Sequence, residues 1–141
     1  MKSTEPRLPR ATTQAAADER FDQLREAFRT RLRLDGLKLM SLGMALTRPA
    51  EDFTSALGHI RDLAHRMRGA ASIFDAANVL SVAAALEDAT VHALETRTTE
   101  ANDAVSKALE ALMTCLSIEA DHEQEDQTAH RRRSNASRYS P

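Results

Sequence analysis

The sequence has few of the residues that build disulfides, strands or membrane spans. Its 141 residues include one cysteine and no tryptophan, with 4% aromatic residues, 4 glycines and 4 prolines. A lone cysteine cannot form an intramolecular disulfide, which favours a reducing compartment. No apolar run approaches the roughly 20 residues of a membrane span, and residues 1–10 lack the apolar segment of a secretory signal. We therefore expect a cytoplasmic protein that does not enter a membrane.

The charge of the chain is nearly balanced. Lys and Arg number 19, Asp and Glu number 21, and the formal net charge is −2. This balance gives no reason to expect a nucleic-acid partner. Hydrophobic residues make up 42% of the chain, with alanine and leucine dominant and few β-branched runs. Such a composition predicts an all-α protein, and the length predicts a single domain with tails.

Apolar residues at helical spacing predict four long helices. The expected ranges are about 18–46, 49–74, 77–94 and 100–118, joined by short turns that favour an antiparallel up-down four-helix bundle. An additional short N-terminal helix is expected to start near Thr12 or Thr13, and Asp35-Gly36 could kink or split the first long helix. In the first, the expected apolar face consists of Phe21, Leu24, Phe28, Leu32, Leu39, Leu42 and Leu46, and it is widened by Leu37, Met40 and Met44. In the second, the expected core residues are Phe53, Leu57, Ile60, Ala64, Met67, Ala71 and Phe74.

Composition also predicts the domain boundaries. Residues 1–13 are polar and contain Pro6 and Pro9, so we expect a disordered N-terminal arm. The helical bundle is expected to occupy residues 14–118. In residues 119–141 the apolar pattern stops, and an acidic run is followed by a basic one. We interpret this segment as a disordered, solvated tail; binding to a phosphate-rich or acidic partner is the alternative.

One histidine has neighbours of an uncommon kind. On a helix, His65 is flanked three and four positions away by Arg61, Arg68 and Gly69, and Ser72 follows one turn later. Glycine inside a helix costs about 0.8–1 kcal/mol relative to alanine, so its presence indicates that something large approaches the ring closely. An imidazole nitrogen, a nearby cation and open space suit a phosphoryl group carried on histidine.

The same residues resemble a known motif. His65-Arg66-Met67-Arg68-Gly69, preceded by Ala64 and followed by Ala70-Ala71-Ser72, resembles the H-x-L-K-G signature of histidine-containing phosphotransfer (HPt) domains. The resemblance covers roughly residues 21–116 and includes Leu86-Glu87, a pair that often follows the motif. Two residues depart from the family pattern. Arg68 replaces lysine, which keeps the charge but changes its geometry, and Asp75 stands where many members have glycine, although aspartate tolerates the left-handed conformation.

The resemblance implies a helical bundle that relays phosphoryl groups. Neutral His65 would attack the aspartyl phosphate of a response-regulator receiver domain through Nε2, and would pass the group to another receiver. Arg68 would stabilise the phosphoryl charge. The partners would be receiver domains and a histidine kinase, including kinases of the hybrid kind, and the chain would be a monomer. It would have no cofactor of its own, because Mg²⁺ would come from the receiver.

Further residues receive roles around His65. Arg61 is expected to help neutralise the phosphate, and Ser72 to hydrogen-bond either the phosphoryl group or a helix carbonyl. Gly69, Ser72, Arg66 and Asp62, with exposed parts of Leu63, are expected to form the surface that a receiver approaches. No metal site is predicted, because His59 and His65 do not share a helix face and the other histidines are scattered. Cys115 is expected to be a buried structural thiol.

The sequence leaves three interpretations open. The chain contains no nucleotide-binding motif, so the first is a covalent phosphotransfer intermediate and not an enzyme. The second is a helical protein that binds or inhibits a two-component signalling protein without being phosphorylated; this protein would tolerate His65→Gln. The third is a scaffold or dimeric adaptor that uses the charged tail. Deleting the residues after Ile118 would abolish the function of an adaptor and leave phosphotransfer intact.

Overall fold

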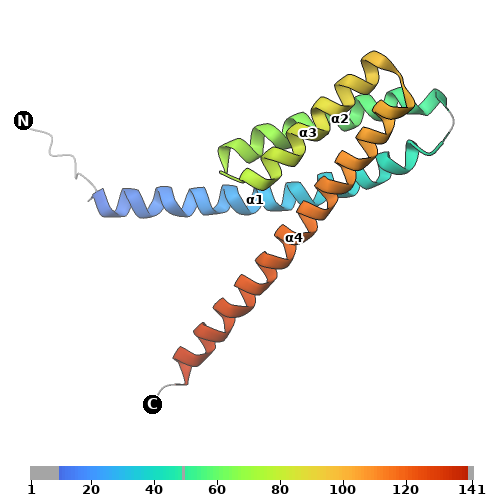
Figure 1. The fold of residues 1–141 in the computed structure, drawn as a ribbon. Helices are drawn as coiled ribbons and strands as arrows, with labels where there is room; N and C mark the ends of the chain where they lie inside the picture. Colours follow the sequence, from blue (N-terminus) through green and yellow to red (C-terminus); the bar gives the residue numbers. More distant parts are fainter. Residues whose placement is uncertain (1–9, 49, 140–141) are drawn as a thin grey trace, which may run out of the picture. The chain divides into compact units, whose positions relative to one another are not determined.

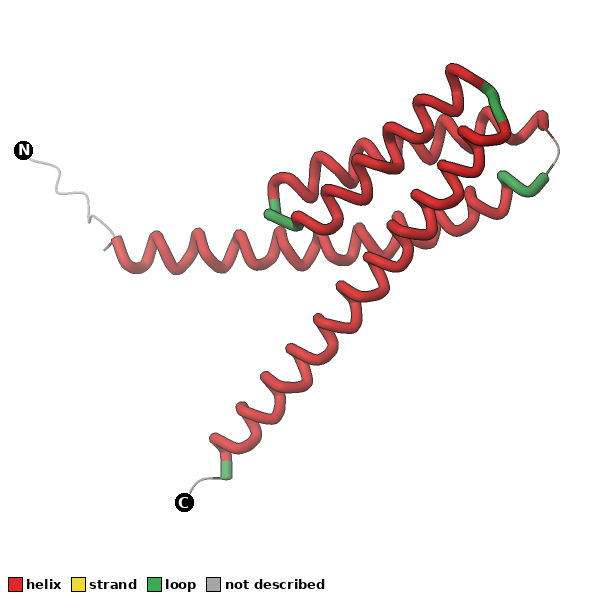
Figure 2. Tube along the Cα trace, in the orientation of Figure 1, coloured by secondary structure: helices red, strands yellow, loops and turns green. Residues whose placement is uncertain are grey.

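A computed structural model describes the backbone of residues 10–48 and 50–139, and within these ranges it contains four helices and no strand. The helices are α1 (Arg10–Ala45), α2 (Ala50–Ile73), α3 (Ala77–Thr96) and α4 (Thr99–Arg138) (Figure 1). Short connections join α2 to α3 and α3 to α4 (Figure 2). The expected all-α, four-helix architecture is confirmed. No described helix is both long and apolar enough to cross a membrane.

The chain divides into two compact units, residues 1–31 and 32–141. The described part of the first unit is the beginning of α1, whose side chains interact along the helix. The Arg25 guanidinium lies 5.0 Å from the centroid of the Phe21 ring, and Gln14 donates to Asp18 over 3.1 Å. The separate short helix expected at the N-terminus is not found, because α1 runs without a break from Arg10. The expected arm is therefore helical from Arg10 on; residues 1–9 lie outside the described residues.

In the second unit, α2 packs against α3 and α3 packs against α4. Figure 1 shows α2 and α3 side by side with opposite chain directions. The apolar stripe predicted for α2 is confirmed at Leu57, Ile60, Ala64, Met67 and Ala71, which are buried, whereas Phe53 and Phe74 are half-buried. Further buried residues of the core come from α3 (Val79, Ala83 and Leu86) and from α4 (Val105 and Leu112).

Two glycines of α1 mark its close approach to α4. A Cβ atom on Gly36 would lie 3.2 Å from Leu116 Cδ1, and one on Gly43 would lie 2.7 Å from Leu109 Cδ2. The two contacts run in opposite directions along the chain, so these parts of α1 and α4 are antiparallel. Of the two possibilities left open at Asp35-Gly36, a split of the helix is not found, because α1 continues through both residues. Gly36 lies within a continuous helix, where it permits close packing and does not end the helix.

The apolar face predicted for α1 is only partly correct. Phe28, Leu32 and Leu39 are buried, but Leu24, Leu37, Met40 and Met44 are each more than half exposed. Leu37 and Leu39 cannot both point inward, because residues two apart are about 200° apart around a helix. Leu37, Met40 and Met44, which we expected to widen the apolar face, are therefore exposed, and so is Leu24 of the predicted face itself.

The charged segment after Ile118 is helical and not disordered as expected, at least through Arg138. Residues 99–140 contain no glycine or proline to interrupt the helix. In addition, the acidic residues of the segment precede its arginines along the helix, an order that complements the helix dipole. The end of the apolar pattern therefore marks where α4 leaves the core and not where the helix ends.

Two residues in the left-handed conformation end α2 and α3. Asp75 follows α2 with φ 55°, as expected for an aspartate at a position that favours glycine. Arg97 follows α3 with φ 53°, and its N–H donates to the Ala93 carbonyl over 3.0 Å. Thr98 then caps α4 by accepting the Ala101 N–H over 3.2 Å. Because the turns are short, α2 packs against α3 and α3 packs against α4. This packing positions the candidate site on α2 and α3.

Candidate functional site

His65 projects from the outer side of α2 toward solvent. Its neighbours Ala64 and Met67 are buried in the core, which fixes the rotation of the helix and directs residue 65 outward. The imidazole side chain is 73% exposed. Its Nδ1 atom lies 2.7 Å from Glu87 Oε1, across the interface between α2 and α3. The ring is therefore held at one nitrogen while most of its surface is open.

Glu87 connects two residues of the predicted motif. Its Oε1 atom meets His65, and its Oε2 atom lies 3.4 Å from Arg68 Nη1. Glu87 belongs to α3, directly after the fully buried Leu86, and its side chain is only 16% exposed. The structure thus brings His65 and Arg68 together around one carboxylate on the neighbouring helix.

The environment of Glu87 keeps this carboxyl group ionised. Partial burial by itself would raise its pKa, but the hydrogen bonds from His65 and Arg68 and the charges of these groups outweigh that effect, so the pKa lies below 4.5. An ionised carboxylate only accepts hydrogen bonds. The Nδ1 atom of His65 therefore carries the hydrogen, and in a neutral ring the lone pair lies on Nε2.

Gly69 leaves the surface beside His65 open. A Cβ atom at this position would meet no other atom within 4 Å, and the same is true of Gly58. Both residues lie on the His65 side of α2, because residues four and seven positions away fall within about 40° of it. Packing inside the described structure thus gives no reason for either glycine. Their presence is compatible with close approach of a second molecule.

Three other predicted site residues lie on the same surface without joining the site. Arg61 donates from Nε and Nη2 to Asp62 Oδ1 over 3.3 and 3.2 Å; the Arg61 side chain is half-buried and that of Asp62 is exposed. Arg61 therefore pairs with its neighbour and not with Glu87. Ser72 is exposed, and the expected hydrogen bond to a helix carbonyl is not found for it in the described part of the chain.

A groove between α1 and α2 lies on the other flank of His65. It has a volume of about 640 Å³, and Asp62, Leu63 and Arg66 contribute to its α2 wall. Along α2, Arg66 lies about 100° from His65 in one direction and Arg68 about 60° in the other. Leu63 is 4% exposed, so the expectation that it contributes an exposed surface is wrong: its side chain packs into the core. The α1 wall is formed by Lys38, Ser41 and Leu42.

The remaining candidates for chemistry show no comparable arrangement. Within residues 10–48 and 50–139, no group of three or more His, Cys, Asp or Glu side chains could hold a metal ion. Cys115 is half-buried and not fully buried as expected. Burial and the nearby charge of Glu119 raise the pKa of its thiol, so the thiol remains protonated at neutral pH and is a poor nucleophile.

Glu87 is the site residue to which the sequence pattern assigns no role of its own. The Leu86-Glu87 pair enters only as part of the resemblance, because helical periodicity cannot show which residue of one helix faces a residue of another. A signal is present: a carboxylate next to a buried leucine on a core helix lies at the edge of a helix interface. Comparison of the chain with protein-family models, curated proteins and solved structures gave no match.

Proposed function

We propose that this chain is a histidine phosphotransfer protein that carries a phosphoryl group on His65 between receiver domains. The observation that carries the proposal is the His65–Glu87 pair, in which Nδ1 is bound 2.7 Å from a carboxylate on a ring that is 73% exposed. This arrangement orients the ring and leaves Nε2 accessible. The resemblance of residues 64–72 to the HPt motif supports the same function.

The transfer step needs little beyond this arrangement. The Nε2 lone pair attacks the phosphorus atom of the receiver's aspartyl phosphate, the P–O bond to the aspartyl carboxyl breaks, and the aspartate leaves as a carboxylate. The Nδ1 hydrogen stays on the ring, which becomes positively charged, and Glu87 stabilises that charge. In the reverse direction an aspartate of another receiver attacks the phosphorus and the neutral ring leaves. A magnesium ion belonging to the receiver would assist there.

Three features around His65 suit a docked receiver. Arg68 lies beside the ring with about half of its side chain exposed, so it can turn from Glu87 toward a phosphoryl group. Gly69 and Gly58 have no side chain, so the backbone of α2 can be approached closely on this side. The groove on the other flank offers the apolar Leu42 with the charged Lys38 and Arg66 for side chains of the receiver.

The test is transfer of labelled phosphate from a phosphorylated receiver to the wild type, to His65→Gln and to His92→Gln. His92 is a matched control, because it is also an exposed helical histidine and does not line the groove. We expect acid-labile, alkali-stable label on the wild type and on His92→Gln, and none on His65→Gln. The resistance to alkali distinguishes phosphohistidine from an acyl phosphate.

Other outcomes would contradict the proposal in different ways. Tight binding of a receiver to both the wild type and His65→Gln, without label on either, would identify a helical binder or inhibitor that is not phosphorylated. Label on His65→Gln would place the phosphoacceptor elsewhere in the chain. Absence of both binding and label across a panel of receivers would remove the phosphorelay function altogether.

A further inference from the structure

The last part of α4 extends beyond the core of the bundle. The last fully buried residue of α4 is Leu112, and from Asp121 to Tyr139 every residue except the half-buried Glu123 is exposed. In proteins most of the stability of a helix comes from packing of one of its faces. An exposed helical segment of about 20 residues would therefore be stabilised by packing against a binding partner.

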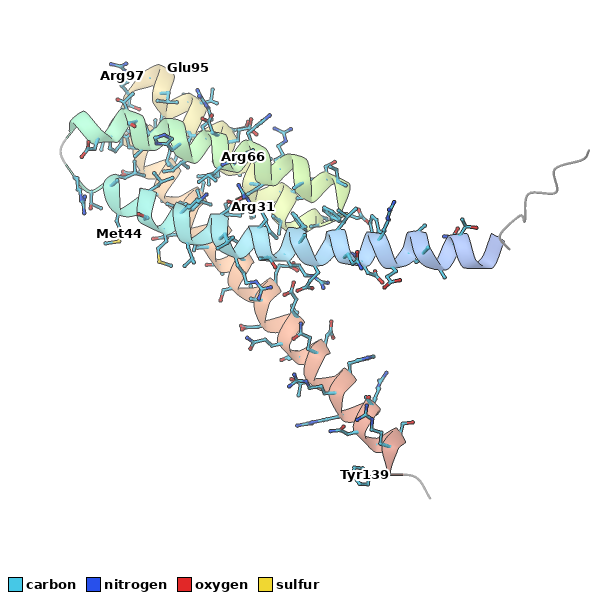
Figure 3. All side chains as sticks on the ribbon, turned by 180° about the vertical axis from the view of Figure 1, so that it is seen from behind. Arg31, Met44, Arg66, Glu95, Arg97 and Tyr139 are labelled. Carbon is cyan, nitrogen blue, oxygen red and sulfur yellow. The ribbon has the colours of Figure 1, made fainter. Side chains whose placement is uncertain are left out.

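One face of this extension combines apolar ends with a charged middle. The face is defined by residues three, four or seven positions apart, and consists of Ile118, Asp121, Glu125, Thr128, Ala129, Arg132, Ala136 and Tyr139. Ile118 is 51% exposed and Tyr139, at the end of α4 (Figure 3), is 89% exposed. Thr128 and Ala129 line a hollow between the charged side chains of Glu125 and Arg132.

The order of residues along this face is complementary to the same face of a second, antiparallel copy of the helix. The midpoint of the sequence between Glu125 and Arg132 lies between Thr128 and Ala129. The midpoint between Ile118 and Tyr139 is the same point. A second copy of the helix in the antiparallel direction would therefore place each Glu125 opposite an Arg132 and each Ile118 opposite a Tyr139. The small side chains at the centre would allow the two helices to approach closely. A parallel pairing would bring like charges together.

We propose that residues 118–139 form an antiparallel, two-fold symmetric interface with the same residues of a second copy of this chain. Charge complementarity selects this partner, because an acidic or a basic macromolecule would match only half of the face. Glu125 and Arg132 are two turns, or about 10.5 Å, apart along one helix, so they pair between copies and not within one. The dimer replaces the monomer expected from the resemblance and does not depend on phosphotransfer.

The test uses charge reversal in the full chain and measures mass by sedimentation and light scattering across a concentration series at low salt. We expect the wild type to dimerise, and E125R or R132E alone to weaken the dimer about tenfold or more, because each reversal places like charges opposite each other. An equimolar mixture of E125R and R132E should dimerise again. The first variant has a positive charge at both positions 125 and 132, and the second has a negative charge at both, so each pair across the interface is again of opposite charge. Added salt should weaken the wild-type dimer.

Asp126→Arg is the matched control. It makes the same change of charge at an exposed position about 100° around the helix from Glu125, and should leave the dimer intact. A wild type that stays monomeric, whether or not it binds a nucleic acid or another protein, overturns the proposal. A mixture of E125R and R132E that stays monomeric, while circular dichroism shows both chains to be folded, also overturns the proposal. The same holds if Asp126→Arg weakens the dimer as much as E125R or R132E does.

Discussion

At the scale of single residues, Glu87 determines which nitrogen of His65 is available for chemistry. A histidine alone on an exposed helix surface could turn either nitrogen to solvent. The 2.7 Å contact with an ionised carboxylate removes this freedom, because it fixes the hydrogen on Nδ1. Arg68 shares the same carboxylate, so the orientation of the ring and the position of the nearby cation depend on one side chain of α3.

The depressed pKa of Glu87 predicts how its contribution to stability changes with pH. Because the pKa is lower in the folded state, the contribution is present above pH 4.5 and is lost as the pH falls through the folded-state pKa. We expect Glu87→Gln to lower the free energy of unfolding at pH 7, and the difference from the wild type to shrink below about pH 4.5. Urea unfolding at a series of pH values would measure this.

The control for this experiment is Glu95→Gln, which changes an exposed carboxylate on the same helix (Figure 3). This variant should follow the wild type throughout the pH range. If the free energies of unfolding of Glu87→Gln and the wild type differ by the same amount from pH 7 to pH 3, the contact with His65 and Arg68 does not depend on the ionisation of Glu87.

Gly69 allows stability and function to be separated at a single position. Because a side chain there meets no other atom within 4 Å, Gly69→Leu should stabilise the fold by up to about 0.8–1 kcal/mol through helix propensity. In a phosphotransfer protein the same leucine should obstruct the receiver and slow transfer by about tenfold or more, a loss of roughly 1.4 kcal/mol in transition-state stabilisation. Thermal unfolding and the rate of labelled transfer measure the two effects.

Gly58→Leu is the matched variant for this pair. It should give a similar gain in stability, because a Cβ atom at Gly58 also meets no other atom within 4 Å. It should affect transfer less, because it lies about 10.5 Å from His65 along the helix, against about 6 Å for Gly69. Equal transfer by the wild type and Gly69→Leu would show that close approach of a partner does not explain the glycine.

At the scale of helices, the sequence pattern predicts α2 well because its apolar residues form one continuous stripe. In α1 and α4 the pattern is less informative for different reasons. Leu37, Met40 and Met44 are apolar but exposed, so residue type does not reveal orientation. Gly36 resembles a helix breaker in the sequence because its packing partner, Leu116, lies 80 positions later in the chain. The Glu87–His65 contact is hidden for the same reason.

The end of α3 predicts an easily measured gain in stability. Arg97 is left-handed, with φ 53° and ψ 38°, a conformation that costs a residue with a Cβ atom about 1–2 kcal/mol and that glycine adopts readily. We expect Arg97→Gly to raise the free energy of unfolding by about 1 kcal/mol. Arg97→Ala, which retains the Cβ atom, should change it little. A Gly variant no more stable than the Ala variant would mean that the turn is not strained.

At the scale of the whole molecule, the candidate site and the candidate interface between copies lie in different parts of the second unit. His65, Arg68 and Glu87 lie on α2 and α3, and Leu112 is the last fully buried residue of α4. The proposed interface begins at Ile118, after the core ends. If the chain is a phosphotransfer protein, its folding and phosphotransfer should therefore be separable from self-association by a cut in α4.

Ending the chain after Ile118 tests that separation. At concentrations where the wild type is monomeric, so that dimerisation does not add to its stability, we expect the shortened chain to keep a cooperative unfolding transition, because the deletion removes no fully buried side chain of the described residues. It should accept phosphate on His65 at an unchanged rate if the chain is a phosphotransfer protein, and it should sediment as a monomer at concentrations where the wild type dimerises. Transfer lost from a shortened chain that is still folded would instead favour an adaptor whose function resides in the charged helix. If the shortened chain keeps both transfer and dimerisation, α4 beyond Ile118 is not the interface, while the function assigned to His65 stands.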